Sequence, residues 1–392
     1  MSFDQDIGRQ HTDCTKWGQM QAATGVDPAE GLPMWVADSD FATAPPVIEM
    51  LRAQVQHGAF GYGYDDPGFR AAIQWWMETR HDWRVASEWI VPTQGLGHAI
   101  AMVFDTWTAP GDGVCFFTPV YHEFSLKTRR AERRPVEIPM RLEQGRYMLD
   151  FDVADQMIND NVKVMLFCSP QNPSGRVWTA DELRAVAEFC QRRNLLLVAD
   201  EVHADLVYPG PSTKHVPMDV AAPDVRPRTI TLTAASKTFN LPGFRTGFAI
   251  IPDDTLRAAY HRRLTMTDYH PSSIGIAATT AAYTPAGAEW VDAQIAYLKG
   301  NRAVFDAGVN AIPGVWSMPL EATYLAWVDF SGTGMDEAEI TARIRDDAQI
   351  GVSRGSAFGV GGETFNRFNL AMPRFMIEDA VARLQRAFAD LQ

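Results

Sequence analysis

Cysteine is scarce in this chain of 392 residues, which contains only four, at positions 14, 115, 168 and 190. No two of them form a C-x-x-C pair, so their spacing argues against a zinc or redox site built on cysteine. Cys115 and Cys168 lie in apolar runs, where a buried, reduced thiol is the ordinary interpretation. We therefore predict a reducing, cytoplasmic compartment and no metal site.

Long hydrophobic runs and excess positive charge are also absent. No apolar stretch approaches the roughly 20 residues that cross a bilayer, and the first ten residues carry acids without the basic and apolar regions of a secretory signal. The chain has 35 Lys and Arg against 48 Asp and Glu, a formal charge of −13. Such a field repels nucleic acid and anionic membranes. We expect neither as a partner, and an anionic small-molecule substrate would need arginines of its own.

The sequence contains no internal repeat, no Walker A motif and no complete dinucleotide fingerprint, which lowers the case for ATP or NAD. Hydrophobic residues make up 46% and charged residues 21%, as in an ordinary globular protein. At this length the chain is long enough for two lobes.

Apolar runs predict buried strands in the first two thirds of the chain. These runs are continuous rather than alternating, which favours a mostly parallel sheet covered on both faces. Between them lie helical patterns such as 179–190, which starts with a capping threonine or aspartate. The order predicts an α/β, doubly wound domain. The runs are Val114–Thr118, Val164–Cys168, Leu195–Ala199, Thr229–Thr233 and Phe248–Ile251.

The pattern changes after about Pro285, where long helices and an alternating strand predict a smaller α+β lobe. The first 35 or so residues have little periodicity and are typical of an arm. The expected elements of the smaller lobe are helices over 290–311 and 336–348, a strand over 323–329 and a final helix near the C-terminus. The expected division is an arm over 1–40 that belongs to the small domain, a large domain over 41–285 and a small domain over 286–392.

Residues with useful chemistry follow four of the predicted strands. In open α/β sheets, ligands bind beyond the carboxyl ends of the strands, so these residues should meet at one edge. An interior lysine such as Lys237 is costly unless it is paired or deprotonated, and a lowered pKa suits a Schiff-base amine. A carboxylate such as Asp200 can keep a pyridine nitrogen protonated. The residues are Tyr121, Asn172, Asp200 with His203, and Ser236 with Lys237.

Each of these residues also has a structural interpretation, which by itself is the commoner one. Lys237 and Asp200 can form a buried ion pair, Tyr121 can simply pack, and His203 can be a hydrogen-bonded core histidine. Asn172 lies in N-P-S-G, which is good turn chemistry.

A glycine turn over 94–97 precedes an apolar helix over 98–104. Such a turn presents free N–H groups to a phosphate, although a plain turn is again the commoner case. The expected convergence of all these residues on one edge is the stronger signal.

Together, these motifs resemble fold-type I pyridoxal-phosphate (PLP) enzymes of the class I/II aminotransferase superfamily. More closely, the chain resembles the cystathionine β-lyase branch, the C–S lyases known as MalY or PatB proteins. The resemblance covers nearly the whole chain. Its motifs lie at residues 15–17, 32–41, 61–62, 168–178, 200–205, 236–240, 322–327 and 367–374.

The resemblance implies roles for the residues at the predicted edge. Lys237 would be the Schiff-base lysine, Asp200 would contact the pyridine nitrogen and Tyr121 would stack on the ring. Asn172, helped by His203, would hydrogen-bond the phenolic oxygen. The residues implied for the phosphate are Gly95, Leu96, Ser236 and Arg245.

The resemblance also implies a substrate clamp and a homodimer. Arg367 would bind the α-carboxylate of an amino acid with two parallel hydrogen bonds, and the backbone of Val36 and Ala37 would lie on the other side. Tyr62 matches the tyrosine that reaches the phosphate from a neighbouring subunit, which implies shared active sites.

Two arginines depart from the lyase pattern. Arg245 stands where aminotransferases usually carry a basic residue and several C–S lyases a neutral one. Arg354 lies near the place where substrate side chains enter, and either a surface position or a substrate-binding role fits it.

The implied reaction is β-elimination of cystathionine or a related cysteine S-conjugate, giving a thiol, pyruvate and ammonia, with Lys237 as the base that takes the Cα proton. Transamination of an amino acid is the main alternative, because it uses the same residues. A second alternative is an additional regulatory role, since a MalY-type relative binds a transcription activator.

Overall fold

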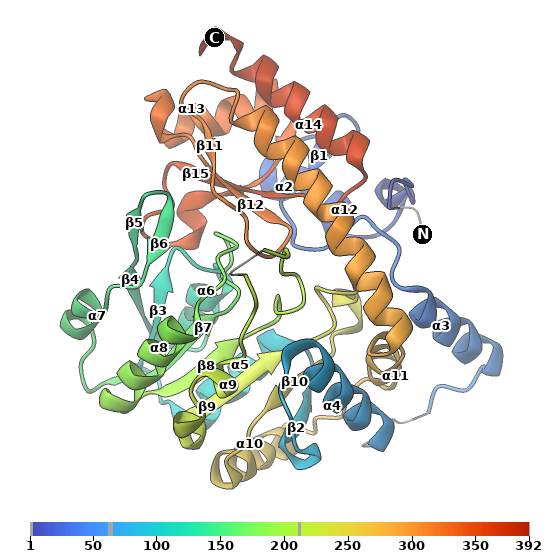
Figure 1. Ribbon diagram of the computed structural model, residues 1–392, viewed down its shortest axis with the longest axis vertical. Helices are drawn as coiled ribbons and strands as arrows, with labels where there is room; N and C mark the ends of the chain where they lie inside the picture. The colour runs from blue at the N-terminus through green and yellow to red at the C-terminus, as the bar shows by residue number, and fades with distance from the viewer. Residues whose placement is uncertain (1–2, 62–65, 211–212, 392) are drawn as a thin grey trace.

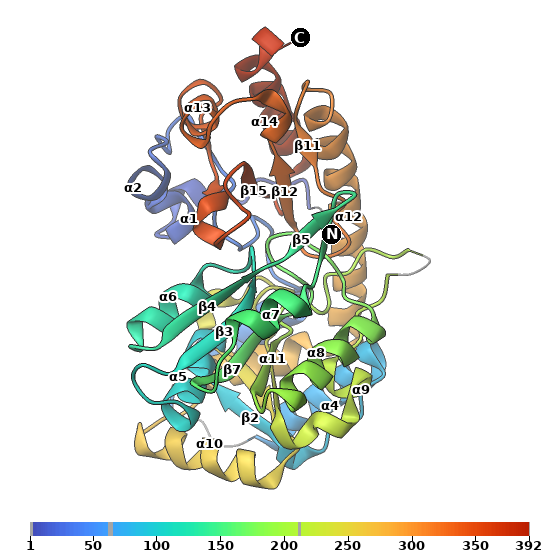
Figure 2. The same ribbon diagram turned by 90° about the vertical axis from the view of Figure 1, so that its left-hand side faces the viewer.

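The computed structural model describes residues 3–61, 66–210 and 213–391. Two sheets organise the chain: a seven-stranded sheet in the lower part of the view in Figure 1 and a four-stranded sheet above it. Helices lie on both sides of the larger sheet (Figure 2).

The strands of the larger sheet have the order β2-β10-β9-β8-β7-β3-β4. Only β10 among these strands runs antiparallel to its neighbours, and the remaining adjacent pairs are parallel. The predicted mostly parallel sheet is therefore confirmed. The bounds are β2 Ile90–Thr93, β3 Gly113–Thr118, β4 Arg134–Pro139, β7 Val162–Cys168, β8 Leu196–Asp200, β9 Thr229–Thr233 and β10 Gly247–Ile250.

Both faces of this sheet are covered, which is why its strands are continuously apolar. In β3, Cys115 and Phe117 pack into a core with α7, α8 and α9, whereas Val114 and Phe116 pack into a second core with α5, α6 and α10. The helices here are α4 Pro67–His81, α5 Leu96–Trp107, α6 Glu123–Arg130, α7 Phe151–Met157, α8 Ala180–Arg192, α9 Met218–Ala221, α10 Asp254–Met266 and α11 Ser273–Ala282.

Helix starts follow their capping residues. The expected capping box before α8 is formed by Thr179, whose side chain accepts from the backbone N–H of Glu182 while the Glu182 carboxylate accepts from the N–H of Thr179. Helix α5 begins at Leu96, two residues earlier than predicted, after Gly95 with a φ of 77°.

The four-stranded sheet is antiparallel and has the order β11-β12-β15-β14. The helix predicted over 290–311 begins earlier, at the N-terminal proline of α12. The strand predicted from residue 323 begins at Leu325, because Thr323 has a φ of 71°. The bounds are α12 Pro285–Val309, β11 Trp316–Ser317, β12 Leu325–Asp329, α13 Glu337–Ala342 with a π-helical turn Arg343–Asp347, β14 Ser353–Arg354, β15 Phe365–Asn369 and α14 Arg374–Ala387.

The arm packs against the C-terminal part of the chain. Strand β1 (Leu32–Pro33) pairs in parallel with β13 (Ile350–Gly351), and the short helices α1 (Thr15–Gly18) and α2 (Met20–Thr24) lie beside this part in Figure 2. This pairing supports the grouping of the arm with the small domain, while the boundaries at residues 40 and 285 stay a prediction.

The remaining described elements are the helix α3 (Pro45–His57) and the hairpin of β5 (Arg141–Glu143) with β6 (Arg146–Met148). Across the described ranges, none of the helices has both the length and the apolar character that a membrane crossing requires.

Candidate active site

A cavity of about 710 Å³ lies beyond the carboxyl ends of β3, β7, β8 and β9. The structure brings to its wall every described residue that the sequence predicts for the site. These residues are Val36, Ala37, Gly95, Leu96, Tyr121, Asn172, Asp200, His203, Ser236, Lys237, Arg245, Arg354 and Arg367. Tyr62 lies outside the described residues.

Lys237 follows β9, and its amine is not paired with any acid among the residues that the structure describes. Its Nζ donates a hydrogen bond of 2.7 Å to the carbonyl oxygen of Ala37. Within the described chain, no hydrogen bond or ion pair joins Lys237 to Asp200, so the interpretation as a buried ion pair is wrong. Burial lowers the pKa of Lys237 to about 8, against the opposing effect of the Asp38 charge. A neutral amine is therefore accessible near neutral pH.

Asp200 is the last residue of β8 and is 5% exposed. Its Oδ1 accepts a hydrogen bond of 3.2 Å from the N–H of Val202. Burial raises the pKa of this carboxyl to about 7. A carboxylate with so few donors would gain from a positively charged N–H group placed in the cavity.

His203 is buried, and its Nδ1 has no hydrogen-bond partner in the described part of the chain. The interpretation as a hydrogen-bonded core histidine is therefore wrong for this nitrogen. Burial, followed by the charges of Lys237 and Arg367, lowers the pKa of His203 to about 3. The imidazole is neutral near pH 7 and can exchange a hydrogen bond with a ligand.

Arg367 comes from β15 and reaches the cavity from the four-stranded sheet. Its Nη1 donates to Oδ1 of Asn172 at 3.0 Å and its Nη2 to the carbonyl of Trp35 at 2.8 Å. Its Nε, also buried, has no partner among the described residues. Burial lowers the pKa of Arg367 to about 10, so the guanidinium stays charged at neutral pH and has a free donor for an anion.

The aromatic wall and the segment opposite Arg367 complete this end of the cavity. Burial raises the pKa of Tyr121 to about 12, so its phenol is neutral. The carbonyl of Val36 accepts a hydrogen bond of 2.6 Å from Nδ2 of Asn369, and that of Ala37 accepts from Lys237. A substrate carboxylate beside Val36 and Ala37 would therefore have to use their N–H groups.

The other end of the cavity is suited to a phosphate. Gly95 is the N-cap residue of α5 and has a left-handed φ of 77°. The first hydrogen bond of the helix runs from the N–H of Ala99 to the carbonyl of Gly95. The N–H groups of the first turn are thus free, and the helix dipole favours an anion there. Ser236 and Arg245 lie on the same wall.

Sequence reasoning missed several residues of the cavity wall, among them His122, Glu123 and Lys127. Glu123 and Lys127 form an ion pair of 3.1 Å on α6. Two signals point to them: His122 and Glu123 directly follow Tyr121, and the i, i+4 spacing of Glu123 and Lys127 places these two on one helix face. Burial lowers the pKa of His122 to about 4, so this imidazole is also neutral.

A lysine with a lowered pKa, a buried acid and a free helix N-terminus at one sheet edge define an enzyme site for an anionic, carbonyl-bearing cofactor. The chain belongs to the family of class I and II aminotransferases, whose pattern matches residues 36–384.

Curated relatives extend over the full chain. It is 33% identical to cystathionine β-lyase PatB of Bacillus subtilis over 99% of this chain and 100% of that protein. It is 32% identical to protein MalY of Escherichia coli over 98% of both chains. Cystalysin from Treponema denticola, whose crystal structure contains a pyridoxal 5'-phosphate cofactor, matches with a TM-score of 0.94 at 32% identity, over 100% of this chain and 99% of that one. The predicted resemblance to the MalY and PatB branch is confirmed.

Proposed function

We propose that this chain is a PLP-dependent carbon–sulfur lyase that cleaves cystathionine or a related cysteine S-conjugate to a thiol, pyruvate and ammonia. One observation carries the proposal: a free lysine amine, a buried acid and a buried arginine line one cavity. The full-length relatives, which include a cystathionine β-lyase, support the reaction type.

The unpartnered atoms of the cavity fit PLP. Asp200 would accept a hydrogen bond from the pyridine nitrogen, which would give this carboxylate the donor that it lacks. The free Nδ1 of His203 would form a hydrogen bond with the phenolic oxygen, together with Asn172. Tyr121 would cover the ring. The residues that would hold the phosphate are Gly95 and Leu96 at the start of α5, with Ser236 and Arg245.

The residues of the chain then have defined tasks. When bound, PLP supplies a cationic ring that accepts the electron pair left at the substrate Cα. Arg367 binds the α-carboxylate through the donors that its protein partners leave free, Nε among them, and orients the Cα–H bond. Lys237, as a neutral amine, takes the Cα proton, and the carboxylate of Asp200 stabilises positive charge on the ring. The Cβ–S bond then breaks and the thiolate leaves with its electron pair, and one water hydrolyses the three-carbon enamine that remains to pyruvate and ammonia.

Arg354 lies on the cavity wall but is exposed. We propose that it receives the distal carboxylate of cystathionine, at the end where the leaving group departs.

Transamination is the second candidate function, and Arg245 favours it, since aminotransferases usually carry a basic residue at this position. A regulatory role of the surface stays a prediction beside either activity. We also propose a cytoplasmic homodimer in which Tyr62 completes the partner's site, as the resemblance implies.

Pyruvate release tests the proposal. Purified protein with PLP should form pyruvate from L-cystathionine without any keto acid, in an assay coupled to lactate dehydrogenase. The same assay with L-alanine and 2-oxoglutarate reports transamination. If pyruvate arises only from alanine, and only with 2-oxoglutarate, the chain is an aminotransferase and the proposed activity is wrong.

A further inference from the structure

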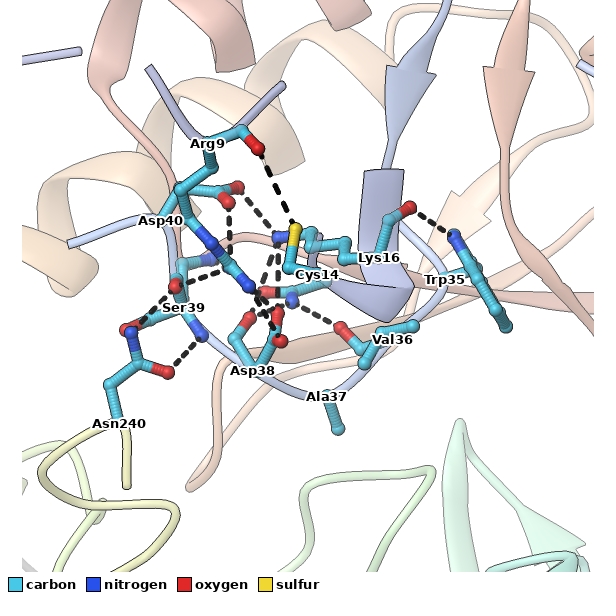
Figure 3. A network of polar contacts seen from close by, with 12 residues as sticks. Arg9, Cys14, Lys16, Trp35, Val36, Ala37, Asp38, Ser39, Asp40 and Asn240 are labelled. Atoms are coloured by element: carbon cyan, nitrogen blue, oxygen red, sulfur yellow. Dashed lines mark hydrogen bonds and ion pairs between the residues drawn. The ribbon is translucent and has the colours of Figure 1, made fainter. Parts of the chain in front are cut away.

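Two cations of the arm hold two carboxylates of the segment 35–41 (Figure 3). The Nζ of Lys16, whose side chain is 0% exposed, lies 2.6 Å from Oδ2 of Asp40. Arg9 donates to both acids, at 2.9 Å from Nη2 to Oδ2 of Asp38 and at 2.9 Å from Nη1 to Oδ1 of Asp40. The four charges balance. A fully buried ammonium is tolerated only with such partners.

The backbone of this same segment meets the cavity. The carbonyl of Trp35 accepts a hydrogen bond of 2.8 Å from Nη2 of Arg367, and the carbonyl of Ala37 accepts one of 2.7 Å from Nζ of Lys237. The indole Nε1 of Trp35 donates in turn to the carbonyl of Lys16 at 2.9 Å. Figure 3 shows Arg9 and the amine of Lys16 beside Asp40, and the carbonyl of Lys16 beside the indole of Trp35. The arm therefore clamps the segment at both ends of the part that touches the cavity.

The direction of Arg367 depends on this clamp. Its Nη1 is held by Asn172, and its Nη2 is held by the carbonyl of Trp35 and, at 3.2 Å, by the hydroxyl of Ser353, whereas its Nε is left for a ligand. The Ser353 hydroxyl itself donates to the carbonyl of Trp35 at 2.9 Å, so a shift of Trp35 would disturb both anchors of Nη2 and let the guanidinium turn. A carboxylate bound by this guanidinium is sensitive to such a turn.

We propose that Lys16 and Arg9 are positioning residues for substrate binding: by fixing the segment 35–41, they hold the Arg367 guanidinium in the direction that receives the α-carboxylate. The inference rests on the role of Arg367 in the proposed function. It assigns a task to Lys16 and Arg9, whose side chains touch no reacting atom.

The test uses the PLP-loaded variants Lys16→Met and Arg9→Met, with Arg226→Met as matched control. Arg226 pairs at 2.9 Å with Asp219, a buried acid outside the cavity. Three readouts are needed: the visible absorption of the bound cofactor, the Kd of glycine by calorimetry, and kcat and KM for pyruvate release. Glycine has the α-amine and the α-carboxylate but no leaving group, so its Kd reports binding of these two groups without elimination.

We expect both arm variants to raise the Kd of glycine and the KM by about tenfold, with kcat within about threefold and the absorption unchanged. Arg9→Lys should lie between, because it keeps the charge and loses the fork. Arg367→Ala should give the largest increase in the Kd of glycine, because it removes the guanidinium itself. Arg226→Met should have the Kd and KM of the wild type.

Unchanged glycine affinity in folded, PLP-loaded Arg9→Met overturns the proposal, and so does a loss of kcat or of cofactor with glycine affinity intact. If Lys16→Met does not fold, Arg9→Met tests the proposal by itself, because the Arg9 side chain is 15% exposed. Absence of pyruvate release in the wild type would refute the lyase activity alone, because the glycine measurement does not depend on it.

Discussion

The amine of Lys237 and the carbonyl oxygen of Ala37 are joined by a hydrogen bond of 2.7 Å although 200 residues separate them in the chain. The lysine comes from the edge of the large sheet, and the alanine comes from the C-terminal end of the arm. The catalytic base proposed here thus has its resting partner in a neutral carbonyl rather than in an acid. A carbonyl partner leaves the lowered pKa of the amine intact.

The first prediction is that Lys237→Ala abolishes the visible absorption of the purified protein. Wild type should be yellow after addition of PLP and dialysis, because the amine forms the covalent link to the cofactor. An absorption spectrum of both proteins checks this. Lys214→Ala, at an exposed lysine paired with Asp82, should stay yellow. A colourless wild type would contradict the whole assignment of the site.

The second prediction concerns the electron-accepting role. Asp200→Asn should keep bound PLP, because the phosphate and lysine contacts remain, but should lose most of kcat. Loss of a carboxylate that stabilises developing positive charge costs roughly 4 kcal/mol or more in the barrier. Steady-state kinetics at saturating PLP measure the change. Asp219→Asn, which alters a buried acid outside the cavity, should keep kcat close to wild type, and a near-normal Asp200→Asn would refute the role.

Much of the cavity wall could be predicted from the sequence because β3, β7, β8 and β9 are largely apolar runs, and each is followed or ended by a residue with chemistry. Tyr121, Asp200 and Lys237 therefore fall on one edge once the sheet is assumed. The antiparallel direction of β10 could not be predicted, since an apolar run between two covered faces has no directional signal.

The contacts of the arm were beyond sequence reasoning for a different reason. A lysine in a short, weakly periodic segment ordinarily stays in solvent, and Lys16 is buried only because Asp40, 24 residues later, folds back to it. The missing partner of His203 Nδ1 could not be predicted either, since hydrogen-bond satisfaction depends on packing between distant elements.

The third prediction is a pH dependence of stability. Burial lowers the pKa of His203 in the folded state to about 3, from an ordinary value of 6.5. At pH values between about 3 and 6.5, the imidazole therefore binds a proton in the unfolded chain but not in the folded one. The free energy of unfolding consequently falls as the pH drops below 6.5. Between pH 7.5 and pH 5, this group should cost the cofactor-free protein roughly 2 kcal/mol of unfolding free energy.

Urea unfolding of wild type and His203→Gln at the two pH values measures that cost. The variant should lose less stability on acidification, by the stated difference, because glutamine does not titrate. His11→Gln, at an exposed histidine, should behave as wild type. Equal losses in wild type and His203→Gln would show that the imidazole does not resist protonation.

The last prediction concerns the choice of leaving group. Arg354→Ala should raise KM for L-cystathionine by about fivefold, close to 1 kcal/mol, which is the upper range for an ion pair at an exposed position. It should leave KM for S-methyl-L-cysteine unchanged, because that substrate lacks the distal carboxylate that Arg354 is proposed to bind. Kinetics with both substrates, repeated for Arg184→Ala on the distant surface of α8, separate this effect from a general loss. Equal increases in KM for the two substrates would mean that Arg354 affects the cavity as a whole. An unchanged KM for both would show that Arg354 is a surface arginine without a role in substrate binding.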